Sequence, residues 1–191
     1  METGYLRLCY ELSHSYHFPE SEFEYIEKAF YAQKLRKGDK FVSEGEVPIG
    51  MAFVVSGLFK YYCIDKNGNE RIKNFIKEND FIASYASFIK RQPSPYYIEA
   101  IEPSEILVVT YEDYSKSLEN NLSWQSVARQ YAEKMFMMKE LRETSLLKDN
   151  AQERYLQFVE ENPDILHRVK QKYIASYLGI APESLSRIIN H

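Results

Sequence analysis

The chain has 191 residues, of which 45% are hydrophobic and 27% are charged, and its formal net charge is −4. This composition excludes an intrinsically disordered chain and is sufficient for one large or two modest domains with hydrophobic cores. No apolar run approaches membrane-spanning length and the N-terminus lacks the pattern of a secretory signal, so we expect a soluble cytoplasmic protein without a membrane partner.

Residue types that carry catalysis or bind metals are sparse. The two cysteines, Cys9 and Cys63, lie far apart and form no C-x-x-C pair, and the four histidines complete no ligand set with carboxylates. A jelly-roll metalloenzyme would need histidines on its strands, but none lies between His17 and His167. No Ser/His/Asp or Cys/His set is legible either. We therefore expect no catalytic residue, no metal and no cofactor, and predict that the protein is not an enzyme.

The N-terminal part of the chain changes its hydrophobic period once. Residues 1 to about 32 have helical spacing, with Ser21 as the expected N-cap of a helix. From about 33 to 111 the chain consists of short β-branched and aromatic runs separated by turn residues, and Asn67 with Gly68 is a typical hairpin turn. Many short strands without helices between them predict a β-sandwich or jelly roll.

Residues 123–147 contain neither proline nor glycine, which predicts one helix of about 25 residues and roughly 37 Å. Apolar positions recur along it at steps of three and four, as on one face of a helix. This stripe can cover the β domain, but its length and its position between two domains favour a seam between the helices of a dimer. The predicted seam residues are Trp124, Val127, Tyr131, Met135, Met138 and Leu141.

The C-terminal segment contains two short apolar-striped helices joined by a tight corner. A preceding helix is expected to begin at a capping box formed by Asp149 and Gln152, and Pro163 stops it. Gly179 can take the left-handed conformation that ends the first helix of the pair, and Pro182 suits the first turn of the second. This spacing is typical of a helix-turn-helix, although a helical hairpin that caps a core has the same pattern.

Local charge favours the helix-turn-helix. Residues 165–191 contain four basic residues and one acidic residue, a net charge of +3 within an acidic chain. A basic module on an acidic body is what contact with phosphates requires. The basic residues are Arg168, Lys170, Lys172 and Arg187, and the acidic residue is Glu183.

These elements, in this order, resemble the Crp/Fnr family of bacterial transcription regulators. The residues IASYLGIAPESLSRII look like the family's DNA-reading motif, and GDKFVSEGEVPIGMAFVVSGLFKYY is similar to the opening of its β-roll. The resemblance implies an α+β fold, with a cyclic-nucleotide-binding-like β-roll (jelly roll) and N-terminal helices in residues 1–121, a dimerisation helix in 122–147 and a helix-turn-helix domain in 148–191. It also implies a homodimer that binds double-stranded DNA at an inverted repeat and contacts RNA polymerase.

The family's nucleotide site is degenerate in this sequence. Its phosphate-binding cassette has a Gly-Glu pair and, about ten residues later, an Arg-Ser or Arg-Thr pair. An ungapped alignment puts Ala83 with Ser84, and Ser94 with Pro95, at those places, so cyclic AMP is not expected to bind in the usual manner. Two interpretations follow: a less anionic effector of unknown identity, or a collapsed roll filled by its own side chains. The candidate effector pocket consists of Tyr85, Phe88, Arg91, Tyr96 and Tyr97.

The sequence therefore predicts a homodimeric, sequence-specific DNA-binding transcription regulator. On its last helix, Leu185, Ile188 and Ile189 are expected to face inward. The candidate DNA-binding residues are Lys172, Pro182, Glu183, Ser184, Ser186 and Arg187. The alternative is a β-roll module that binds a small ligand and uses its helical C-terminus for protein contacts, and the salt dependence of DNA binding separates the two.

Overall fold

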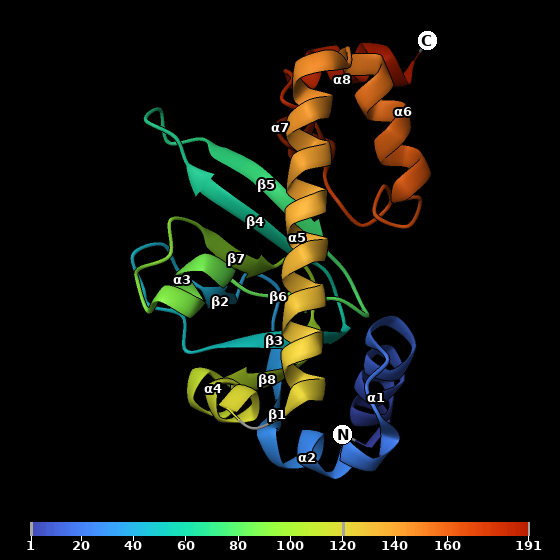
Figure 1. Ribbon diagram of the computed structural model, residues 1–191. Helices are drawn as coiled ribbons and strands as arrows, with labels where there is room; N and C mark the ends of the chain where they lie inside the picture. Colours follow the sequence, from blue (N-terminus) through green and yellow to red (C-terminus); the bar gives the residue numbers. More distant parts are fainter. Residues whose placement is uncertain (1, 120, 191) are drawn as a thin grey trace.

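The computed structural model describes residues 2–119 and 121–190, which form a β-roll with helices on both sides of it in the sequence (Figure 1). At the N-terminus, α1 (Glu2–Tyr16), the 3-10 turn η1 (Glu20–Glu22) and α2 (Phe23–Ala29) precede the first strand. The predicted N-terminal helices are thus confirmed. The N-cap of α2 is Glu22 rather than Ser21, because residues 20–22 form the 3-10 turn.

The roll consists of two four-stranded antiparallel sheets, which confirms the predicted jelly roll. The first has the strand order β1 (Phe30–Leu35), β8 (Ser104–Thr110), β3 (Gly50–Ser56) and β6 (Phe81–Ile82). The second has the order β2 (Lys40–Val42), β7 (Tyr97–Ala100), β4 (Phe59–Ile64) and β5 (Glu70–Ile76). The helix α3 (Tyr85–Lys90) follows β6, and α4 (Tyr111–Glu119) follows β8.

Strand β3 shows why the first sheet is apolar on both faces. Ala52 and Val54 belong to the core between the two sheets, together with Phe59 of β4. Phe53 belongs instead to the core between the sheet and the helices. Successive side chains of a strand point to opposite faces, so the continuous apolar run of β3 serves the interior of the roll and the helical layer at once.

Helix α5 (Leu122–Lys148) has 27 residues and runs along the roll from the N-terminal helices to the C-terminal helices (Figure 1). Its N-cap is Asn121, whose side-chain oxygen accepts a hydrogen bond from the backbone N–H of Trp124 at 2.9 Å. Trp124, Val127 and Tyr131 are buried in the core between the first sheet and the helices. The seam prediction is therefore wrong for these three residues, because this half of the stripe covers the chain's own β domain.

Helices α6 (Ala151–Glu161), α7 (Gln171–Leu178) and α8 (Pro182–Ile189) complete the fold. The capping box of α6 is formed by Asn150 and Glu153, one residue later than predicted. Asp149 still belongs to the end of α5, since its backbone N–H donates to the carbonyl of Ser145. Among the residues that the structure describes, no helix combines the length and the apolar character that crossing a membrane requires.

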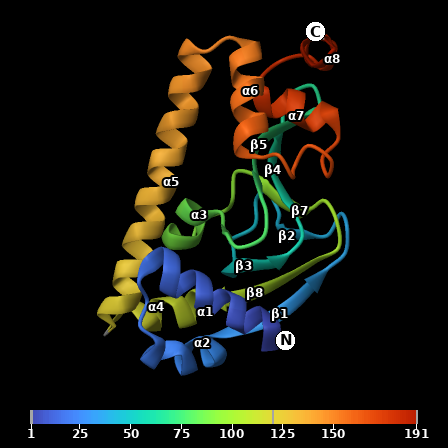
Figure 2. The same cartoon turned by 90° about the vertical axis from the view of Figure 1, so that its right-hand side faces the viewer.

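The C-terminal helices share a hydrophobic core with the roll, which the sequence did not indicate. Helix α7 packs against β5, as Figure 2 shows from the side. We call this cluster the interdomain core. It contains Leu58, Tyr62, Ile72 and Phe75 from the roll and Phe158, Ile165, Val169, Ile174, Ala175, Leu178 and Leu185 from the helices.

Candidate nucleic-acid interface and ligand site

The corner between α7 and α8 has the geometry expected of a helix-turn-helix. Gly179 caps α7 in the left-handed conformation, with φ of 72°, and its backbone N–H donates to the carbonyls of Ala175 and Ser176. Pro182 opens α8, where its missing N–H costs nothing. Ala175 and Leu185 are fully buried, so small and branched side chains close the angle between the two helices. The corner predicted from glycine and proline is present.

The outward face of α8 is polar and accessible. Pro182, Glu183, Ser186 and Arg187 are exposed and Ser184 is half-buried. Within residues 2–119 and 121–190, the Arg187 guanidinium makes only long local contacts, at 3.4 Å to the carbonyl of Glu183 and 3.5 Å to Ser184 Oγ, so it is available to a ligand. Lys172 is exposed at the start of α7. The six candidate DNA-binding residues therefore lie at the surface or partly exposed.

One residue on α8 departs from the predicted faces. Ile189, expected to face inward, is exposed. Leu185 is buried and Ile188 is half-buried, so the apolar stripe of α8 narrows toward its C-terminal end.

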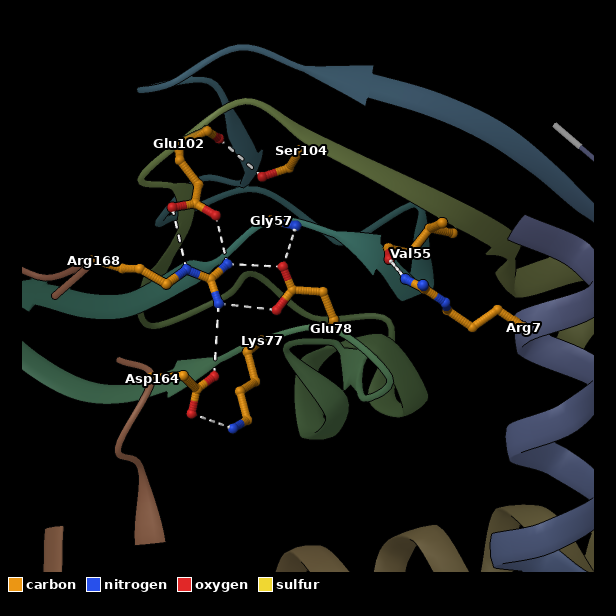
Figure 3. Close-up of polar contacts among 9 residues, drawn as sticks. All are labelled: Arg7, Val55, Gly57, Lys77, Glu78, Glu102, Ser104, Asp164 and Arg168. Carbon is orange, nitrogen blue, oxygen red and sulfur yellow. Dashed lines mark hydrogen bonds and ion pairs between the residues drawn. The ribbon is translucent and has the colours of Figure 1, made fainter. Parts of the chain in front are cut away.

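Arg168, counted above among the phosphate-contacting charges, is bound to acidic residues of the same chain (Figure 3). Its guanidinium donates to both carboxylate oxygens of Glu78, at 2.8 and 3.0 Å, and also to the carboxylate of Glu102. Asp164 lies 3.8 Å away. The hydrogen bonds to Glu102 and Glu78, together with the negative charges of these carboxylates, raise the pKa of Arg168 above its ordinary value. This arginine joins the C-terminal helices to the roll and is not free for phosphate.

Lys60 forms a second contact between the roll and the C-terminal helices through its charge. Its side chain projects from β4, is almost fully buried, and donates to Glu70 at 2.7 Å while Glu99 lies at 3.3 Å. Its ammonium group also lies over the rings of Tyr62, at 4.2 Å, and Tyr173 of α7, at 4.6 Å. Burial alone would lower the pKa of Lys60, but Glu70 and Glu99 outweigh it and raise that pKa. The lysine therefore stays charged inside the interface.

The structure does not bring the five candidate effector residues into one pocket. Tyr85 and Phe88 pack in the core between the first sheet and the helices. Tyr96 belongs to the core between the two sheets, and Tyr97 packs against the interdomain core. The prediction of a single aromatic pocket is wrong, because α3, the bend before β7 and β7 itself direct these aromatic side chains to three different hydrophobic cores.

Arg91, the remaining candidate of the effector pocket, is held at the surface of the roll. It caps α3 in the left-handed conformation, with φ of 51°. Its guanidinium donates to the carbonyl of Pro48 and lies 4.6 Å from the centre of the Tyr111 ring. The Arg91 cation is thus engaged by Pro48 and Tyr111.

The polar groups at the aligned cassette positions bond to one another. Ser94 Oγ donates to the carbonyl of Tyr96 at 2.7 Å and lies 2.9 Å from Ser84 Oγ. The backbone N–H of Ala83 donates to the Tyr61 hydroxyl at 3.0 Å. Tyr61 is buried, which raises its pKa well above the ordinary value, so it remains neutral. The hydroxyl groups of Ser84 and Ser94 and the backbone N–H of Ala83 thus have hydrogen-bond partners within the chain.

The second half of α5 presents an apolar face to solvent. Met135 is half-buried against the chain's own core, whereas Met138 and Leu141 of the predicted seam are exposed. The exposed face extends beyond the prediction. Its members, with their exposed fractions, are Phe136 (66%), Met137 (56%), Leu141 (68%) and Leu147 (87%).

Comparison with known proteins accounts for both parts of this architecture. A family model described as the cyclic nucleotide-binding domain matches residues 32–121. The solved structure of FixK2 from Bradyrhizobium japonicum is 19% identical, covers 84% of this chain and 83% of its own, and gives a TM-score of 0.72. A protein from Eubacterium rectale described as a transcriptional regulator of the Crp/Fnr family is 18% identical over 91% of this chain and 83% of its own, with a TM-score of 0.72. The chain has the fold of the Crp/Fnr regulators.

The Crp/Fnr fold extends to more distant structures. The Catabolite Activator Protein of Thermus thermophilus is 18% identical, covers 94% of this chain and 85% of its own, and gives a TM-score of 0.57. No curated protein matches this chain by sequence. Within this Crp/Fnr fold, sequence reasoning missed the contacts made by Lys60 and Arg168. The one available signal was a lysine inside the apolar run LFKYYC, which is unusual for a buried strand.

Proposed function

We propose that this protein is a homodimeric, sequence-specific DNA-binding transcription regulator. The observation that carries the proposal is the exposed polar face of α8, whose buried side packs into the interdomain core through Leu185. Arg187 and Glu183 lie one turn apart on this face, so both can reach neighbouring base pairs in one groove. The second helix of such a unit is the one that enters the major groove.

The chemistry of α8 suits base recognition. Arg187 can donate two hydrogen bonds to the O6 and N7 of guanine, and Glu183 can accept from the amino group of cytosine. The hydroxyl groups of Ser184 and Ser186 and the ammonium group of Lys172 are suited to phosphates, which orient the helix without reading sequence. Pro182 contributes a rigid start to the helix.

The dimer is proposed to form through the exposed face of α5. An apolar surface of this kind on a soluble helix is typically covered by a partner. A second copy of the same helix is the simplest occupant, since a two-fold axis makes the face self-complementary. Because the dimer presents two reader helices, the target is expected to be an inverted repeat with half-sites about one helical turn apart.

Two substitutions test the reader assignment. Arg187→Ala is expected to weaken binding by about 1 to 3 kcal/mol and to relax the preference at one base position in each half-site. Lys172→Ala is expected to weaken binding to all DNA sequences alike. It should also reduce, by about 1, the slope of the logarithm of the binding constant against the logarithm of the salt concentration. Selection from random DNA, followed by titrations at several salt concentrations, measures both effects. If wild-type protein enriches no inverted repeat, the helices make protein contacts instead and the alternative function gains.

The roll is proposed not to bind cyclic nucleotides. Ser84 and Ser94 satisfy each other where a carboxylate and a guanidinium would hold ribose and phosphate, and the Arg91 cation is engaged by Pro48 and Tyr111. Titration calorimetry with cyclic AMP and cyclic GMP is therefore expected to give no saturable heat at micromolar concentrations. A dissociation constant near 1 μM, about −8 kcal/mol, would show that the roll opens and that another cation holds the phosphate.

A further inference from the structure

We propose that Arg168 is a positioning residue that sets the distance between the two DNA half-sites. The proposal rests on the proposed function, because it requires a dimer with two readers. Arg168 lies between α6 and α7 and does not touch DNA in this scheme. It acts by fixing the helix-turn-helix against the roll, and the roll in turn is fixed to α5.

The acceptors of Arg168 are themselves held in place (Figure 3). Glu78 Oε1 accepts a hydrogen bond from the backbone N–H of Gly57 at 2.8 Å. Burial would raise the pKa of Glu78, but the hydrogen bonds from Arg168 and Gly57 hold it below its ordinary value. The backbone carbonyl of Glu102 accepts from Ser104 Oγ at 2.9 Å. A planar guanidinium bonded to two fixed carboxylates allows little rotation, which a lysine could not achieve.

The loop of residues 77–80 links the reader to the long helix. Lys77 pairs with Asp164 at 2.7 Å, next to the contact between Glu78 and Arg168. Two residues further, Asp80 pairs with Lys134 of α5 at 2.9 Å. The backbone of the same loop is bonded to β3, since Asn79 N donates to the Val54 carbonyl and Val54 N to the Asp80 carbonyl. One four-residue loop thus ties the reader, the roll and the dimer helix together.

Helix α7 is held at both ends. At its C-terminal end, Arg142 of α5 donates to the carbonyl of Tyr177 at 2.6 Å, and Arg154 of α6 donates to the carbonyl of Leu178 at 3.1 Å. At its N-terminal end, Arg168 precedes the first residue of the helix by three positions. Loss of Arg168 removes the charged contact at one end only and leaves Ile165 and Val169 in the interdomain core. The reader is then expected to keep its fold and its base contacts but to vary in direction.

A spacing series tests this role. Two identical half-sites are placed at the wild-type optimum and at one or two base pairs more or fewer, and affinities are measured for wild type, Arg168→Gln and the control Arg36→Gln. Arg36 is a matched arginine, exposed and paired only with Asp39. Wild type and Arg36→Gln should bind the neighbouring spacings about tenfold more weakly than the optimum, whereas Arg168→Gln should bind all of them within about threefold.

Binding to a single half-site separates the inference from the function on which it rests. If wild type binds neither an isolated half-site nor an inverted repeat, the proposed function fails. If both proteins bind the half-site equally and Arg168→Gln keeps the sharp spacing optimum, the positioning role is wrong. A lower half-site affinity together with a smaller salt slope would make Arg168 a phosphate contact and would also overturn the inference.

A second pair of variants guards against misfolding. Arg168→Lys keeps the positive charge but loses the planar fork, and Glu78→Gln keeps an acceptor for Gly57 but loses the ion pair. Both are expected to flatten the spacing profile in the same direction as Arg168→Gln while the circular dichroism spectrum stays unchanged. An unchanged profile in both folded variants would contradict the proposal.

Discussion

Replacing Leu141 by glutamate is expected to convert the proposed dimer into monomers. Leu141 lies at the centre of the apolar face that α5 presents to solvent, so a second copy would bury the new carboxylate without a partner. A central interface position is worth about 2 kcal/mol or more, and two-fold symmetry counts it twice, which makes about 4 kcal/mol or roughly a thousandfold in the dimer constant. Sedimentation equilibrium measures this change directly.

The control for this experiment lies two residues away. Lys139 is exposed and about 200° around the helix from Leu141, at 100° per residue. Lys139→Glu introduces the same glutamate on the opposite side of α5 and is expected to leave the dimer intact. Met135 is a poorer choice, because it packs against the chain's own core and its substitution would disturb the monomer. A dimeric Leu141→Glu would show that α5 is not the interface.

Replacing Lys60 by methionine is expected to lower the free energy of unfolding by about 3 kcal/mol, the lower end of the cost of breaking a buried ion pair. The substitution removes the cation between Tyr62 and Tyr173 and leaves Glu99 partly buried without its partner. Chemical denaturation measures the change. Adding Glu99→Gln to the same chain should recover part of the loss, since the unpaired charge is then gone.

Lys28→Met provides the matched control for the lysine. Lys28 pairs with Glu24 at 2.7 Å, the same distance as Lys60 to Glu70, but both partners are largely exposed. An exposed pair of this kind is worth at most about 1 kcal/mol. If the two substitutions destabilise the protein equally, the buried ion pairs of Lys60 contribute no more than an exposed pair. Its contact with α7 then adds little stability.

Local sequence rules predicted the corner between α7 and α8. They could not predict how these helices pack against the roll. Gly179 and Pro182 act through their own backbone preferences, which the sequence displays directly. The contact of Arg168 with Glu78 joins residues ninety positions apart, and nothing local distinguishes that arginine from Lys172, which remains exposed. Charge counting therefore assigned to DNA an arginine that the fold uses internally.

The long helix shows a second limit of sequence patterns. Its apolar residues lie on more than one face, so Trp124 and Leu141 both fit a stripe of three and four residue steps. Only Trp124 is buried by the chain itself, in the core between the first sheet and the helices, whereas Leu141 is exposed. The prediction that the candidate tyrosines form one pocket was wrong for a related reason. Tyr96 and Tyr97 are adjacent in sequence, but Tyr96, just before β7, packs against the core between the sheets and Tyr97, the first residue of β7, packs against the interdomain core.

The interdomain core limits which C-terminal helices can be joined to this roll. Leu58, Tyr62, Ile72 and Phe75 of the roll are covered by the C-terminal helices and not by their own sheet alone. Exchanging those helices for the reader of another regulator would uncover this patch unless the incoming helices carried complementary side chains. The roll and the C-terminal helices are therefore expected to evolve together, so that a change of side-chain volume at Phe75 is matched on α6 or α7.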